Sequence, residues 1–162
     1  MAGGGTGNDR SAALVRVGFA AQRSGDVRRA IRCYTLSLED RPTAEAYTYR
    51  AWAYSFLGRW DDAVADCRKA IELAPDRGDA YNDLGAYLIE QGKHDEAVPW
   101  LESALAAPRY DTRAYPHFNL GRVFAARGEL QRAAAAYRAA LDERADFGPA
   151  RAALADLESS LH

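Results

Sequence analysis

The residues of this chain that could carry chemistry are its histidines, its cysteines and two pairs of neighbouring acids. The histidines are His94, His117 and His162, and none belongs to an H-E-x-x-H, Cys-His or Ser-His-Asp arrangement that the spacing would support. We expect His117 to be a packed or surface residue. No catalytic residue is assigned, and the chain is predicted not to be an enzyme.

The cysteines and the paired acids have structural explanations. Cys33 and Cys67 lack C-x-x-C spacing and neighbouring histidines, which argues against metal or redox roles and favours two small apolar residues in a reducing cytosol. The pairs Asp61/Asp62 and Asp95/Glu96 could bind a metal or act as acid and base. However, each pair lies where a helix is expected to begin, and carboxylates there complement the helix dipole. Neither a metal ion nor a cofactor is expected.

A glycine followed five residues later by an alanine recurs with successive spacings of 33, 34 and 36 residues. The pairs are Gly25/Ala30, Gly58/Ala63, Gly92/Ala97 and Gly128/Ala133. A period near 34 residues is typical of a helix-turn-helix unit that buries its apolar face only against its neighbours. The spacing predicts an all-α chain in which each glycine forms the tight turn of a helical hairpin.

Aligning the chain on these pairs divides it into repeats and two end segments. We expect a flexible tail at 1–10, repeats at 11–43, 44–77, 78–113 and 114–147, and a final helix at 148–162. The two extra residues of the third repeat fall between Pro108 and Arg113. The final segment repeats the pattern of a first helix without a partner, so it is expected to cap the array.

The pattern resembles the tetratricopeptide repeat (TPR) over residues 11–147. The third repeat shows it best, with Ala80-Tyr-Asn-Asp-Leu-Gly-Ala-Tyr-Leu88, Gly92-Lys-His-Asp-Glu-Ala97 and Trp100-Leu-Glu-Ser-Ala-Leu105. The resemblance implies a right-handed α-solenoid of four hairpins plus a C-terminal capping helix, similar to small free-standing bacterial members of the family. Arg50 departs from the pattern by replacing an aliphatic residue, and we expect its guanidinium at the edge of the helix interface.

The resemblance also implies a binding site, because first helices of such arrays line a concave groove. The residues that it places in the groove are Arg16, Phe19, Tyr49, Trp52, Phe56, Asn82, Asp83, Tyr115, Asn119 and Arg122. Aromatic side chains would supply contact area and Asn and Arg would supply hydrogen bonds to an extended peptide or a partner helix. Alternatively, Tyr49, Trp52 and Phe56 pack against neighbouring first helices or the N-terminal tail.

The groove does not match the clamp with which similar proteins hold a chaperone's C-terminal carboxylate. That clamp places Lys and Asn at the second and sixth positions of successive repeats. Here the second positions are Ala12, Glu45, Asp79 and Tyr115, and the sixth are Arg16, Tyr49, Asp83 and Asn119. Only Asn119 fits, and the central acids would repel a carboxylate.

Charge and hydropathy limit the class of partner. The chain has 21 Lys and Arg against 23 Asp and Glu, a formal net charge of −2, which argues against nucleic-acid binding. It lacks the run of roughly 20 apolar residues that spans a bilayer, and a cytoplasmic location is expected. We therefore expect a protein or peptide partner and a monomer or weak homodimer. The alternative is a self-assembling structural element that forms homo-oligomers.

Overall fold

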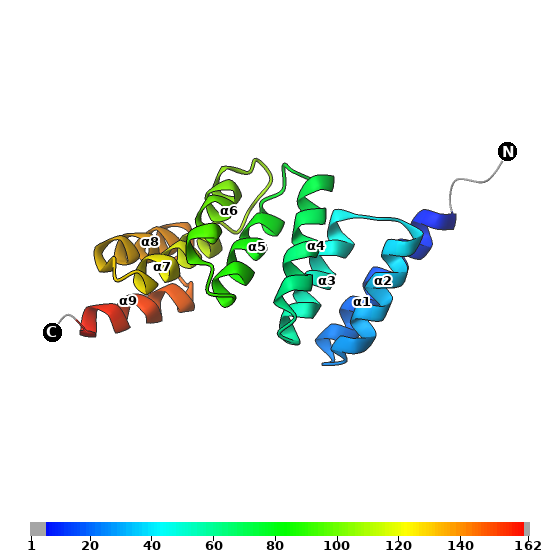
Figure 1. Cartoon of the computed structure of the whole chain (residues 1–162), viewed down its shortest axis with the longest axis horizontal. Coiled ribbons are helices and arrows are strands. Elements are labelled where there is room, and N and C mark those ends of the chain that lie inside the picture. The colour runs from blue at the N-terminus through cyan, green and yellow to red at the C-terminus, as the bar shows by residue number, and fades with distance from the viewer. Residues whose placement is uncertain (1–5, 161–162) are drawn as a thin grey trace. The chain divides into compact units, whose positions relative to one another are not determined.

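The structure is a computed structural model that describes residues 6–160 (Figure 1). Over this range the chain forms nine α-helices and no β-strand, which confirms the expected all-α fold class. The helices are α1 (Thr6–Arg23), α2 (Val27–Asp40), α3 (Ala44–Phe56), α4 (Trp60–Leu73), α5 (Gly78–Glu90), α6 (His94–Ala106), α7 (Ala114–Ala126), α8 (Leu130–Glu143) and α9 (Gly148–Ser160). None of these helices is long and apolar enough to cross a membrane.

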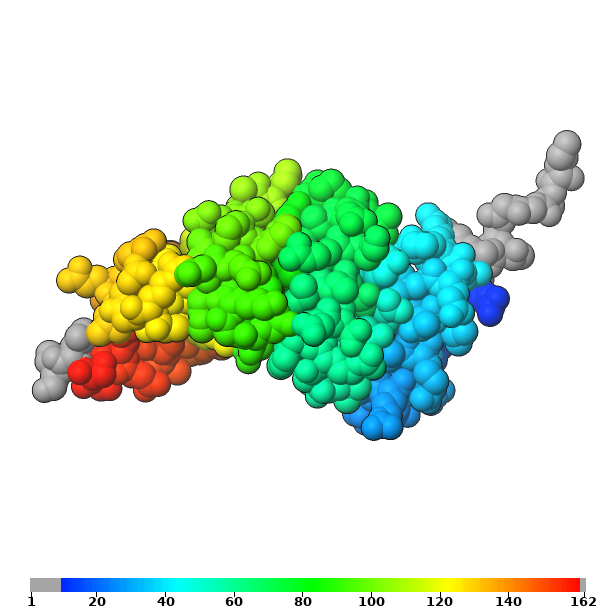
Figure 2. Space-filling model, in the orientation of Figure 1, coloured from blue at the N-terminus to red at the C-terminus, as the bar shows by residue number. Residues whose placement is uncertain are grey.

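The helices fall into two compact units, and the chain passes from the first to the second between Pro75 and Asp76. Unit 1 holds α1–α4 and unit 2 holds α5–α9. Within each unit, consecutive helices pack as hairpins, α1 with α2, α3 with α4, α5 with α6 and α7 with α8. Figure 2 shows the side chains filling the spaces between the helix ribbons of each unit.

The first helix begins earlier than expected. The sequence places a flexible tail at 1–10, whereas α1 already starts at Thr6. Ser11 is buried and shares hydrogen bonds with Ser37 of α2, including 2.8 Å between the two hydroxyl oxygens. Packing on α2 therefore holds the helix from Ser11, the first residue of the first expected repeat. Residues 1–5 of the expected tail lie outside the described range.

Each hairpin turns at its repeat glycine. Gly25, Gly58, Gly92 and Gly128 have φ of 87°, 67°, 75° and 75°, a region in which L side chains are strained. At the first turn the Gly25 N–H donates to the Gln22 carbonyl and the Asp26 N–H donates to the Ala21 carbonyl at 2.9 Å. This is the Schellman pattern, which satisfies the free carbonyls of a helix end. The predicted tight turns are thereby confirmed.

Small residues on first helices face large residues on second helices. A Cβ added to Gly18 would lie 2.6 Å from the Tyr34 ring, and one added to Gly85 would lie 2.5 Å from Leu101. The same geometry joins Gly121 and Tyr137. These distances are far below van der Waals contact, so only glycine allows the helices of these hairpins to approach so closely.

A charged residue, Arg50, borders the core of unit 1. The Arg50 guanidinium donates to both carboxylate oxygens of Asp66, at 2.7 and 2.8 Å, and to the Thr35 hydroxyl at 3.1 Å. It also lies 5.7 Å from the ring centres of Tyr47 and Tyr54. The Arg50 side chain is 17% exposed and the residue is partly buried, so its guanidinium lies deeper than the expected edge position but is not fully enclosed. Asp66 and Thr35 supply the partners that draw it inward.

The core of unit 2 extends onto α9. Ala150 and Leu157 of α9 are buried against Tyr137 and Ala140 of α8 and against Phe147 in the preceding connection. Ala153 and Leu154 pack partly buried on the same cluster, while Arg151, Asp156 and Glu158 are exposed. The helix thus presents one apolar face to the array and one polar face to solvent.

Candidate functional site

Unit 1 carries an aromatic surface formed by Phe19 of α1 and Tyr49, Trp52 and Phe56 of α3. The Phe19 ring centre lies 5.5 Å from that of Tyr49 and 6.5 Å from that of Trp52. Trp52 and Phe56 meet edge to face at 5.4 Å. Phe56 is 61% exposed and Trp52 is 36% exposed. The structure therefore brings four predicted groove residues together and leaves two of them open to solvent.

Helix periodicity explains why these residues meet. Tyr49, Trp52 and Phe56 are three and seven residues apart, so they share one face of α3. Phe19 occupies the position of Trp52 in the preceding repeat, 33 residues earlier. Tyr49 is half-buried and stacks on Tyr34 of α2 at 5.8 Å. Packing among the helices thus accounts for Tyr49, but it leaves most of Phe56 uncovered.

Two arginines of α1 border the aromatic surface. Arg16 and Arg23 are both exposed, and the Arg23 guanidinium lies 5.9 Å from the Phe19 ring centre. Within the part of the chain that the structure describes, neither arginine pairs with a carboxylate. The surface therefore combines exposed rings with free positive charge.

Unit 2 carries a polar network on α5 and α7. The Asn119 amide donates to the Asn82 side-chain oxygen at 3.0 Å, and Asn82 donates to Asp83 at 3.4 Å. Arg122 donates to the Asn119 oxygen at 3.4 Å and to Glu90 at 2.6 Å. Asn82 and Asn119 are buried. The structure thus brings together Asn82, Asp83, Asn119 and Arg122, all of which the sequence predicts as groove residues.

Asp83 is the titratable centre of this network. Burial raises the pKa of the Asp83 carboxyl to about 7, the Asp79 carboxylate adds to the shift, and the hydrogen bond from Asn82 opposes it. The unfolded chain would release this proton near pH 4. The contribution of Asp83 to stability is therefore complete below about pH 4 and is lost as the pH rises through 7.

An Asp83→Asn variant should show this dependence directly. As the pH rises from 4 to 8, its free energy of unfolding should increase relative to that of the parent chain by on the order of 2 kcal/mol, because the amide carries no charge to desolvate. Urea unfolding followed by circular dichroism at several pH values measures the difference. The exposed Asp111→Asn variant should instead run parallel to the parent, and a pH-independent gain for Asp83→Asn would contradict the assignment.

Tyr115 lies one turn before Asn119 on α7 and, among the described residues, takes no part in the hydrogen bonds of the network. It is 42% exposed, and its ring meets that of Phe147 edge to face at 5.0 Å. Phe147 lies in the connection between α8 and α9, outside any first helix. The repeat pattern gives the position of Tyr115 on α7 but does not reveal this neighbour.

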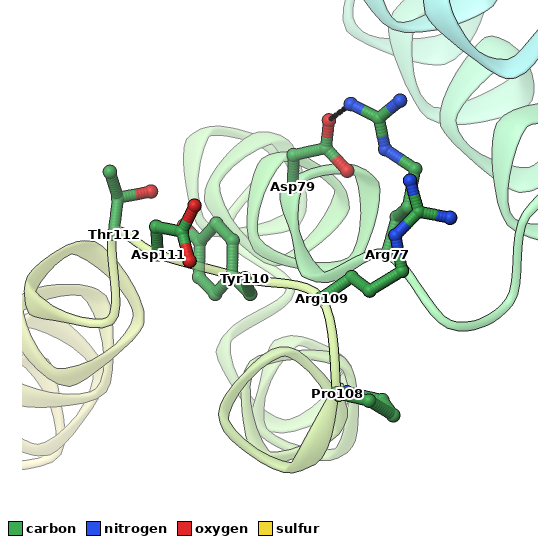
Figure 3. Close-up of a pocket in the computed structure, with 7 residues that line it drawn as sticks. All are labelled: Arg77, Asp79, Pro108, Arg109, Tyr110, Asp111 and Thr112. Atoms are coloured by element: carbon green, nitrogen blue, oxygen red, sulfur yellow. Dashed lines mark hydrogen bonds and ion pairs between the residues drawn. The ribbon is translucent and has the colours of Figure 1, made fainter.

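A pocket of about 540 Å³ lies beside the two-residue expansion of the third repeat (Figure 3). The connection between α6 and α7 pairs with the segment before α5, where the Arg109 N–H donates to the Asp76 carbonyl at 3.0 Å. Tyr110 is buried on Gly78, whose lack of a Cβ admits the ring. Arg77 and Asp79 form an ion pair at the rim, at 2.8 Å. The sequence analysis does not predict this pocket, although the 36-residue spacing between Gly92 and Gly128 indicates the two extra residues beside it.

The other candidate chemical groups are scattered. His117 is half-buried on α7, and burial lowers the pKa of its imidazole below the usual value. Asp61/Asp62 and Asp95/Glu96 lie in the first turns of α4 and α6, where the sequence places them. Cys33 and Cys67 do not form a disulfide. Among the described residues, no group of three potential ligands is placed to hold a metal ion.

Comparison with known proteins identifies the repeats. The family model of the tetratricopeptide repeat matches residues 42–109 and 76–144. Sperm-associated antigen 1 of Rattus norvegicus is 42% identical over 90 residues, which are 56% of this chain and 10% of that protein. The SGT1 homolog of Oryza sativa is 39% identical over 95 residues, which are 58% of this chain and 26% of that protein. The chain therefore spans about a quarter or less of these relatives.

Solved structures share the fold. PilW, a type IV pilus biogenesis factor, superimposes with a TM-score of 0.86 at 26% identity, covering 92% of this chain and 69% of PilW. The second TPR of Spaghetti (RPAP3), bound to the HSP90 peptide SRMEEVD, has a TM-score of 0.59 at 27% identity. The match covers 60% of this chain and 92% of that one. These matches confirm a helical TPR solenoid. The chain belongs to the tetratricopeptide repeat family, whose fold supports protein–protein interaction.

Proposed function

We propose that this chain is a non-enzymatic, cytoplasmic interaction scaffold that binds an extended peptide or a partner helix on the faces of its first helices, the groove that the sequence predicts. The aromatic surface of unit 1 carries the proposal. Trp52 and Phe56 expose large rings at the centre of a cluster, and such rings supply much of the energy at protein interfaces. The similar RPAP3 domain holds a peptide, which supports the same use of the fold here.

The polar network of unit 2 supports hydrogen bonding to a bound backbone. Asn82 and Asn119 are themselves buried, and Asn119 accepts a hydrogen bond from Arg122, whose side chain is 33% exposed. The network therefore holds the Arg122 guanidinium in place, so that its N–H groups would lose little conformational freedom on donating to a bound backbone. A peptide backbone presents the complementary groups at regular intervals.

A Trp52→Ala/Phe56→Ala variant tests the proposal. Peptides selected from a displayed random library against the parent chain should bind this variant at least about tenfold more weakly, a loss of roughly 1.4 kcal/mol. Fluorescence anisotropy measures the affinity, and circular dichroism checks that helicity is retained.

The matched control removes exposed apolar side chains elsewhere in the same unit. Leu36 of α2 and Leu73 of α4 are 45% and 51% exposed, and neither lies on a first helix. A Leu36→Ala/Leu73→Ala variant should bind the selected peptides like the parent. Unchanged binding by Trp52→Ala/Phe56→Ala would refute the proposal. A stable dimer in light scattering that this variant disperses would assign the surface to self-assembly.

A further inference from the structure

We infer that the aromatic surface of unit 1 is specific for an extended acidic segment in which two carboxylates four residues apart bracket an apolar side chain. The inference rests on the proposed function and specifies its partner. Arg16 and Arg23 would bind the carboxylates, while Phe19, Trp52 and Phe56 would receive the apolar side chain.

The first support is that these arginines lack the partners that other arginines of the chain have. Arg50 pairs with Asp66 in unit 1, and Arg122 pairs with Glu90 in unit 2. Arg16 and Arg23 are exposed and, among the described residues, have no such carboxylate. A guanidinium binds a carboxylate through two parallel hydrogen bonds, so both remain available to an external acid.

The second support is the register of the two helices. Arg16, Phe19 and Arg23 occupy the same repeat positions as Tyr49, Trp52 and Phe56, 33 residues later. The ring contacts of Phe19 with Tyr49 and Trp52 confirm that α1 and α3 lie side by side at this level. The two arginines therefore stand at opposite ends of the exposed rings, with Phe19 between them.

The spacing of the arginines sets the spacing of the ligand's acids. Seven residues of α-helix separate Arg16 and Arg23, a rise of about 10 Å. Side chains alternate along an extended backbone, so acids four residues apart face the same side as the one side chain midway between them, which would meet the rings. At about 3.3 Å per residue these acids lie about 13 Å apart, and the long arginine side chains can splay outward to reach them.

The charge of unit 1 favours the same partner. Its sequence holds eleven Lys and Arg against nine Asp and Glu, a formal net charge of +2, although the whole chain is at −2. Glu45 of α3 is exposed on the face of Tyr49, but it lies one turn before Tyr49 and so beyond the level of Arg16. A positive surface with free guanidinium groups attracts acidic ligands and repels basic ones.

Three labelled peptides test the inference. The acidic probe is Gly-Ser-Glu-Ser-Phe-Ser-Glu-Ser-Gly, and the two others carry Gln or Lys in place of both Glu residues. At low ionic strength the acidic probe should bind the full chain at least about tenfold more tightly than the Gln probe, and the Lys probe should bind most weakly. In Arg16→Gln/Arg23→Gln this preference should fall below about twofold, with the Gln probe little affected.

The control removes the same charge from another face of unit 1. Arg28 and Arg32 of α2 are exposed, and Arg28→Gln/Arg32→Gln should keep most of the preference for the acidic probe. If all three probes bind the parent chain equally, and Trp52→Ala/Phe56→Ala binds none of them, the inference is overturned but the proposed function stands. Persistence of the preference in Arg16→Gln/Arg23→Gln would also overturn it. Binding of no probe, or binding indifferent to Trp52 and Phe56, would count against both.

Discussion

Replacing Asp66 with alanine should destabilise unit 1 by about 3–5 kcal/mol, because the Arg50 guanidinium would stay inside the unit without its counter-charge. Asp66 is 5% exposed, and its two oxygens accept two hydrogen bonds from Arg50. These hydrogen bonds raise the pKa of the guanidinium further above its usual value, so the arginine cannot shed its charge to adapt. Urea unfolding in a Trp100→Phe background, followed by the fluorescence of Trp52 and Trp60, both in unit 1, measures the loss.

Two comparisons separate this effect from general damage. Arg50→Met/Asp66→Leu removes both charges and should recover most of the stability, because apolar residues of similar volume often replace a buried ion pair without loss. Asp62→Ala removes an exposed ion pair, in which the Arg59 side chain is 51% and the Asp62 side chain 47% exposed. This variant should lose less than about 1 kcal/mol of stability. A loss below 1 kcal/mol for Asp66→Ala would show that water or a shifted side chain replaces the carboxylate.

Deleting residues 148–162 should destabilise unit 2 by about 3–6 kcal/mol and promote self-association. Leu157 and Ala150 of α9 are buried and Leu154 is partly buried, and each buried leucine contributes about 1.5–3 kcal/mol. The deletion would also uncover Tyr137 and Ala140 of α8, an apolar face that a neighbouring molecule could then cover. Thermal unfolding and light scattering measure the two effects.

A milder pair of variants keeps this test informative if the truncated chain does not fold. Leu154→Ser/Leu157→Ser leaves α9 in place but removes its apolar face, and it should lower the melting temperature in the same direction. Arg138→Ala removes only the exposed ion pair with Glu158 and should change little. Unchanged thermal stability and solubility of the truncated chain would show that α9 is not a cap.

The turns and the helix packing could be predicted from the sequence because local rules decide them. A glycine at a fixed place in each repeat indicates a backbone with positive φ, which few other residues tolerate. A glycine in the middle of a first helix indicates that the second helix approaches closely, as at Gly18 and Gly85. Four copies of the same pattern also give the face of each first helix, which is why Phe19 and Trp52 fall in one aromatic cluster and Asn119 in the polar network.

The contacts of individual side chains could not be predicted in this way. Arg50 stays inside unit 1 because Thr35 and Asp66, on two other helices, both offer it oxygen atoms. Tyr115 meets Phe147, which lies in a connection and follows no repeat position. A repeat pattern fixes where a residue sits on its helix, whereas these partners depend on which side chains the neighbouring segments supply.

The pairing of small and large residues constrains how such repeats can be recombined. Three hairpins match a glycine on the first helix with Tyr34, Leu101 or Tyr137 on the second. The second repeat has Ala51 on α3 and Cys67 on α4 at these positions, and both are fully buried. Its first helix therefore has a larger side chain than glycine, and its second helix has a smaller one than tyrosine or leucine. A first helix carrying Ala51 could not accept a tyrosine opposite it. Shuffling of these repeats, in evolution or in the laboratory, must therefore exchange whole hairpins and not single helices.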